Sequence, residues 1–270
     1  MLPLILIIST VLSLAIGIPL YHKKRRNNLM NQNVPESWPT ILKDEFPLLK
    51  FLNPKDKESL MGLIHIFLDE VQFIGCNKLE IDERIRVTIA AQACLLTLHN
   101  PTQKHFNKLN TIYVYPSTFS SQVNEANHGI ISESDSARLG QSSRGSIVLA
   151  WDSCRQGASN YQDGHNVIFH EFAHQLDQET GPADGIPILQ ERSAYLDWGR
   201  IMYKQFLKLR KNKEQRRKTL IDTYGALNEA EFFAVCTECF FEKPKQLHKK
   251  HPEVYRVLHE YYGLDPKTWN

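Results

Sequence analysis

The chain has 270 residues, of which 42% are hydrophobic and 23% charged, so it can bury one full core and wholesale disorder is excluded. The net charge is only +2, and four of the 32 basic residues form one cluster at residues 23–26, which leaves 28 basic against 30 acidic residues elsewhere. We therefore expect no direct nucleic-acid binding. The five cysteines are odd in number and scattered, which suits a reducing compartment and not a disulfide framework.

Residues 2–21 contain no charged side chain. As a helix they would span about 30 Å, the thickness of the hydrocarbon core of a membrane. A cleaved signal peptide is the alternative, but the basic cluster follows the apolar run instead of preceding it, and no small-residue cleavage site precedes the cluster. The positive-inside rule keeps such a cluster in the cytoplasm. We predict a single-pass anchor in the cytoplasmic (inner) membrane over residues 1–21, a basic juxtamembrane segment and linker over 22–37, and a cytoplasmic domain over 38–270.

The remaining elements follow from hydrophobic periodicity. A helical apolar stripe predicts a helix that begins at Pro54, and a second helix is predicted over about residues 82–98. Residues 111–115 and 146–151 have strand-like composition, and the Ser-, Asn- and Gly-rich residues 117–145 between them predict a long surface loop. Helices, then a small sheet, then more helices predict a mostly helical α+β fold.

His170, Glu171 and His174 form an HExxH motif. Two histidines four residues apart lie on one face of a helix, so both imidazoles can reach one metal ion, and the glutamate can take a proton from metal-bound water. The alternative is a surface helix with two incidental histidines, which would have charged residues between them, whereas here those positions are apolar apart from Glu171. We expect Asp163 and Gly164, just upstream, to cap this helix.

A catalytic zinc site needs a third protein ligand. Glu231 and Glu238 are seven residues apart on a predicted helix and therefore share a face. Glu231 is the ligand candidate, although an acidic residue at a helix start can equally be solvated near the positive end of the dipole. Asp177 and Asp184 are rival ligands. Asp177 could instead accept a hydrogen bond from a ligand imidazole, and Glu238 is a second candidate for a supporting position behind the ligands. Asp184 could be a turn residue.

Two other features have plainer interpretations. Cys236 and Cys239 form a CxxC pair, but no second pair exists to complete a structural zinc site, so we expect two packed thiols. Residues 204–218 are basic enough to contact anionic lipid, although a solvated helix face explains them as well.

Beyond these single motifs, the sequence resembles the Mlc titration factor family of zinc-dependent peptidases from about Trp38 to Phe241. The stretches that carry the resemblance are residues 89–96, 112–116, 163–167, 170–177, 183–185 and 230–235. The resemblance implies a zincin-like domain with a gluzincin site, in which His170, His174 and Glu231 hold one zinc ion and Glu171 is the catalytic base. The site is also similar to that of the anthrax lethal factor catalytic domain, which implies transition-state support by Tyr224, seven residues before the glutamate ligand. A packed aromatic is the alternative for Tyr224.

Two functions follow as expectations. The first is an enzyme that hydrolyses peptide bonds by metal-activated water. The second, also implied by the resemblance, is a regulatory protein that sequesters a transcriptional repressor of sugar transport, with peptidase activity secondary. The predicted anchor departs from the soluble members of the family and would make such a regulator a membrane-tethered one.

Overall fold

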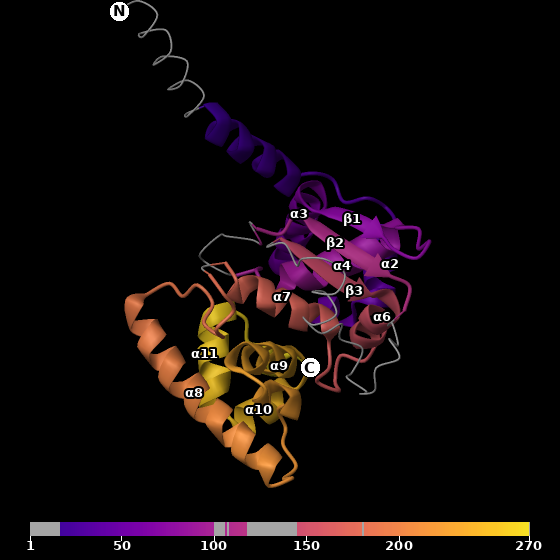
Figure 1. Cartoon of the computed structure of the whole chain (residues 1–270). Helices are drawn as coiled ribbons and strands as arrows, with labels where there is room; N and C mark the ends of the chain where they lie inside the picture. Colours follow the sequence, from indigo (N-terminus) through magenta and orange to yellow (C-terminus); the bar gives the residue numbers. More distant parts are fainter. Residues whose placement is uncertain (1–16, 100–105, 107, 118–144, 180, 270) are drawn as a thin grey trace, which may run out of the picture.

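The computed structural model describes residues 17–99, 106, 108–117, 145–179 and 181–269 (Figure 1). Most of the predicted anchor, residues 1–16, and most of the predicted surface loop lie outside this part of the chain. Within it, no helix is both long enough and apolar enough to cross a membrane.

The first described segment, residues 17–30, is helical and therefore includes most of the basic juxtamembrane residues. This helix is tied to the domain by ion pairs. Arg25 Nη2 lies 2.7 Å from Asp69 Oδ1, and Arg26 Nε lies 3.5 Å from Glu70 Oε1. Both acids are at the end of helix α3 (Pro54–Glu70). Two of the four clustered basic residues therefore have partners within the chain.

The end of this helix packs closely against α3. A Cβ atom placed on Gly62 would lie 2.5 Å from the sulfur and 2.6 Å from the carbonyl oxygen of Met30, so only glycine permits this approach. Part of the segment predicted as a linker is thus helical and packed on the domain, and the irregular stretch begins only after residue 30.

Four further elements precede or flank the sheet: α2 (Trp38–Glu45), the 3-10 helix η1 (Pro47–Phe51), α3, and α4 (Glu83–Leu95). The helices predicted from Pro54 and over 82–98 are confirmed as α3 and α4. Each has a side-chain cap, because Asn53 accepts a hydrogen bond from Asp56 N and Asp82 accepts one from Ile85 N.

The sheet has three parallel strands in the order β1 (Gln72–Gly75), β2 (Thr111–Tyr115) and β3 (Ser146–Ala150). Gln72 pairs with Thr111, which pairs with Ser146. Both predicted strands are present, but β3 ends at Ala150 because helix α6 (Trp151–Ser159) begins there. The parallel β1–α4–β2 crossover was not predicted, since β1 has only four residues and directly follows α3.

The second half of the chain is helical: α7 (Val167–Asp177), α8 (Arg192–Glu214), η2 (Thr223–Ala226), α9 (Glu229–Glu242), α10 (Pro244–Lys250), α11 (Pro252–Tyr262) and η3 (Pro266–Thr268). Figure 1 shows α7 between the sheet with its helices and the group formed by α8 to α11. Helix α7 packs against α9 on one side and α4 on another. The prediction of a mostly helical domain with a small sheet is confirmed.

Cys236 and Cys239 lie on α9, which is buried along most of its length. Both are free thiols within the hydrophobic core. Burial raises the pKa of Cys239 to about 12, so this thiol is inert at neutral pH. The expectation of two packed thiols is confirmed.

Candidate metal centre

Helix α7 begins at a side-chain cap. Asn166 Oδ1 accepts a hydrogen bond from Phe169 N at 3.0 Å, so Asn166 is the cap residue. The prediction that Asp163 and Gly164 cap this helix is wrong. Asp163 instead closes the preceding turn by accepting a hydrogen bond from His165 N at 2.9 Å.

Two histidines extend from one side of α7 into a largely buried space. His170 is 1% exposed, whereas the His174 side chain is 15% exposed. The apolar residues of the same helix are also buried: Ile168, Phe169, Phe172, Ala173 and Leu176. The His170 imidazole therefore lies in the core, and the His174 imidazole lies closer to the solvent.

Glu231 reaches the same point from α9. Asn228 caps that helix by accepting a hydrogen bond from Glu231 N at 2.8 Å, which places Glu231 in the first turn. Its Oε2 atom lies 3.0 Å from His170 Nε2 and 3.4 Å from His174 Nε2. Glu231 is therefore both a helix-start acid and a member of the cluster, so the two interpretations of its position do not exclude each other.

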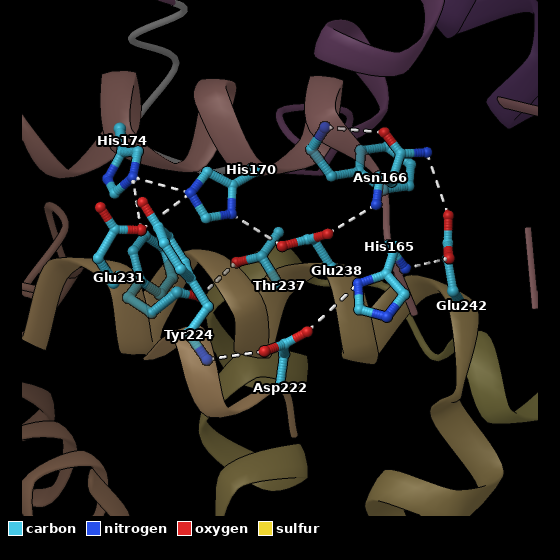
Figure 2. Close-up of polar contacts among 12 residues, drawn as sticks. His165, Asn166, His170, His174, Asp222, Tyr224, Glu231, Thr237, Glu238 and Glu242 are labelled. Atoms are coloured by element: carbon cyan, nitrogen blue, oxygen red, sulfur yellow. Dashed lines mark hydrogen bonds and ion pairs between the residues drawn. The ribbon is translucent and has the colours of Figure 1, made fainter. Parts of the chain in front are cut away.

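The two imidazole nitrogens complete a tight cluster. His170 Nε2 and His174 Nε2 are 3.2 Å apart, and each is close to the same carboxylate oxygen (Figure 2). Glu231 Oε2 is buried and has no hydrogen-bond partner of normal geometry among the described residues. Two imidazole nitrogens and an unsatisfied carboxylate oxygen that converge in this way fit one divalent metal ion.

The electrostatics of the cluster are strongly coupled. Burial opposes the charged form of His170, but contacts with Glu231 and Glu238 outweigh burial and raise the pKa of His170 to about 10. Burial acts in the opposite direction on Glu231, and its contacts with His170 and His174 lower its pKa to about 2. The site therefore stabilises positive charge beside Glu231, the charge that a bound cation would supply.

Glu238 lies behind His170. Its Oε1 atom is 2.8 Å from His170 Nδ1, and its Oε2 atom accepts a hydrogen bond from Asn166 N at 2.6 Å. In the neutral imidazole that a metal ion requires, this contact with Oε1 favours the proton on Nδ1 and leaves the Nε2 lone pair directed at the cluster. Glu238 was predicted to lie behind the metal ligands, and its role toward a bound ion stays a prediction.

The two aspartates considered as ligands lie elsewhere. Both carboxylate oxygens of Asp177 accept backbone hydrogen bonds, from Gly185 N at 2.8 Å and from Ile186 N at 2.9 Å, and thereby hold the turn that follows α7. Asp184 accepts a hydrogen bond from Ile186 N within the same turn. Neither aspartate belongs to the metal-capable group found among the described residues.

Glu171 follows His170 on α7 and is partly buried. Burial raises its pKa, while the neighbouring His170 and His174 act in the opposite direction. No hydrogen bond joins its carboxylate to another residue in the part of the chain that the structure describes.

Tyr224 approaches from η2. Asp222 caps this short helix by accepting a hydrogen bond from Tyr224 N at 2.7 Å, and Asp222 Oδ2 also lies 3.5 Å from His165 Nδ1. The Tyr224 ring is centred 5.9 Å from that of His170. Figure 2 shows this ring directed toward the cluster of His174 and Glu231.

The chain matches the family model described as glucose-regulated metallo-peptidase M90 over residues 20–263. It belongs to this family. It is 39% identical over 275 residues to the uncharacterized protein slr2042 of Synechocystis sp., with 98% of each chain covered. It is also 28% identical to the Mlc titration factor A of Escherichia fergusonii, which covers 82% of this chain and 83% of the relative. The protein of the same name from Cronobacter sakazakii is 27% identical, with 86% and 87% covered.

Membership in the M90 family agrees with the resemblance found in the sequence. The match begins at residue 20, close to the end of the uncharged N-terminal run, and it includes the whole cluster. Three residues of this M90 chain that were not predicted as site residues, Asn166, Gln92 and Glu242, form a buried polar group beside the cluster. Only Asn166 had a local signal, because it is a cap-type residue directly before the apolar residues of α7.

Proposed function

We propose that this M90 protein is a zinc-dependent peptidase. The observation that carries the proposal is the convergence of His170 Nε2, His174 Nε2 and Glu231 Oε2 within 3.4 Å of one another. Two imidazoles and one carboxylate, with a further coordination position left for water or substrate, are the donor set of catalytic zinc in several peptidases.

His170, His174 and Glu231 would hold the ion. When bound, zinc would acidify a water molecule and polarise the peptide carbonyl. Glu171 takes the proton of the attacking water and passes it to the leaving amine. Burial suits Glu171 to this exchange, because a raised pKa brings a carboxylate nearer to the operating pH.

Tyr224 supplies a hydrogen-bond donor for the same reaction. Its ring faces the cluster (Figure 2), and its backbone is fixed by the Asp222 cap. A phenol hydroxyl held in this way would donate to the carbonyl oxygen as negative charge develops on it.

Digestion of a peptide library by the purified full chain tests the proposal, with Glu171→Gln as the matched variant. Gln has nearly the same shape but cannot accept the proton, so the variant should keep its metal and lose turnover. Equal cleavage by both proteins would remove Glu171 from the mechanism, and no cleavage by the natural chain would refute the peptidase proposal.

Binding of a transcriptional repressor is a second candidate function. It is favoured by relatives named Mlc titration factor A that are 27–28% identical to this chain. The Glu171→Gln variant separates the two functions, because repressor binding by a surface outside the cluster would survive the loss of turnover. A repressor that binds the natural chain and the variant equally would support this candidate, and a repressor that binds neither would refute it.

For localisation we propose a single-pass anchor in the cytoplasmic membrane with the catalytic domain in the cytoplasm. The uncharged residues 2–21 and the basic residues 23–26 support it. The helix of residues 17–30, tied to α3 by the Arg25–Asp69 ion pair, would then hold the domain close to the membrane surface.

A further inference from the structure

Helix α9 carries three glutamates on one face. Glu231, Glu238 and Glu242 are spaced by seven and four residues, and all three contact residues of α7 or the turn before it. We propose that Glu242 and Asn166 are positioning residues that act through Glu238 to aim His170 at the metal and to fix α7 against α9. This inference rests on the proposed metal site and concerns how strongly that site binds its ion.

Glu238 is the link between the cluster and its support. One of its carboxylate oxygens contacts His170 Nδ1, and the other accepts the hydrogen bond of Asn166 N, the residue that caps the same helix (Figure 2). Rotation of the His170 ring would break its contact with a carboxylate that is itself held by the start of α7. The direction of the ring therefore depends on where Asn166 is placed.

Asn166 is 2% exposed, and both polar atoms of its side chain make hydrogen bonds that hold it in place. Its Oδ1 atom accepts the capping hydrogen bond from Phe169 N. Its Nδ2 atom donates to Gln92 Oε1 on α4 at 2.9 Å and to Glu242 Oε1 on α9 at 3.1 Å. Each hydrogen of the amide thus has a partner on a different helix, and one residue fixes α7 against both neighbours.

Glu242 holds the turn before Asn166. Its Oε2 atom accepts hydrogen bonds from Gly164 N at 2.8 Å and from His165 N at 3.1 Å. Gly164 has a φ of +78°, a left-handed conformation that favours glycine, and it lets the turn present these N–H groups. The three consecutive N–H groups of residues 164–166 therefore all donate to two carboxylates one turn apart on α9.

Two buried carboxyl groups on α9 are an unfavourable way to stabilise the fold. Glu238 and Glu242 are 6% and 5% exposed, and burial together with the nearby charge of Glu238 raises the pKa of Glu242 to about 9, so the ionised form of this carboxyl group costs free energy here. Hydrophobic side chains of similar volume would fill the space at lower cost. The polar group instead fixes the orientation of the side chains that it contacts, because hydrogen bonds restrict angles that apolar packing leaves free.

The test compares Glu242→Gln with Glu45→Gln in the full chain. All three partners of the Glu242 carboxylate are N–H donors, so the new amide must face at least one donor with its own NH₂ group. Glu45 is a matched control, because it is also 5% exposed but pairs with Arg84 and Arg155, away from the cluster. Affinity for Zn²⁺ is measured by chelator competition, and the visible absorption of the Co²⁺-loaded protein reports ligand geometry.

We expect Glu242→Gln to weaken Zn²⁺ binding roughly 10–100-fold and to alter the Co²⁺ spectrum, as is typical when a group that supports a metal ligand is lost. Glu45→Gln should change the melting temperature but neither metal readout. Unchanged affinity and spectrum in folded Glu242→Gln would overturn the inference.

Asn166→Ser is the second variant, in case Glu242→Gln fails to fold. Serine keeps an N-cap acceptor but lacks both amide donors, so the helix start should survive while zinc affinity falls. Natural affinity in this variant would also overturn the inference. If the natural chain itself binds no Zn²⁺, both the proposed function and the inference fail. If it binds Zn²⁺ and all variants do so equally, only the inference fails.

Discussion

Replacing Tyr224 by Phe removes one hydroxyl from the cluster while leaving its surroundings in place. One hydrogen bond that fixes this residue runs from its backbone N–H to Asp222, and phenylalanine retains it. The ring, which packs against the core and lies 5.9 Å from the ring of His170, is also retained. Stability and zinc content should therefore be nearly unchanged.

The rate should fall sharply, because the hydroxyl would donate only to charge that develops in the transition state. Loss of one such donor costs about 2.7–4 kcal/mol, a decrease in kcat of roughly 10²–10³-fold, with little change in KM. The measurements are kcat, KM, zinc content and melting temperature on one preparation. Tyr203→Phe is the matched control, since Tyr203 is 53% exposed on α8 and should change none of them.

A Tyr224→Phe variant with normal zinc, normal stability and at least about half of the natural kcat would refute this reasoning. Tyr224 would then be a packing residue, and catalysis would depend on the metal and Glu171 alone.

Two further predictions concern pH and topology. Burial lowers the pKa of His65, so its neutral form is favoured in the fold and stability should be lost as pH falls below about 6.5. His65→Phe keeps a ring against Trp38. Between about pH 7.5 and 5, the free energy of unfolding of this variant should fall less than that of the natural chain. If the two free energies fall equally with pH, His65 does not contribute the predicted pH dependence. Protease added to intact cells should leave the domain uncut, and digestion there would reverse the proposed topology.

Local patterns predicted the parts of the fold and site that depend on neighbours in sequence. The helices that begin near Pro54 and Asp82 were recognisable because their apolar residues repeat at helical spacing. His170 and His174 were recognisable for a similar reason, since a separation of four residues alone places both rings on one face. In contrast, β1 has four residues and too little pattern to identify.

Long-range pairings could not be predicted in the same way. Spacing alone left Glu231 undecided between a solvated helix start and a ligand, and the family resemblance decided it. Nothing in the sequence indicated that Gln92, Asn166 and Glu242 would meet, because they belong to three helices whose packing is decided by the whole core. Asp177 illustrates the opposite error, since a carboxylate near the motif was considered for the metal site but holds the turn at Gly185.

The metal content of the purified full chain, compared with that of His174→Ala, tests the central claim most directly. His174 supplies one of three converging ligand atoms and is more exposed than His170, so its truncation should remove a ligand with limited effect on the core. We predict one zinc ion per natural chain and almost none in the folded variant. A natural chain without zinc, or a variant that retains it fully, would contradict the account.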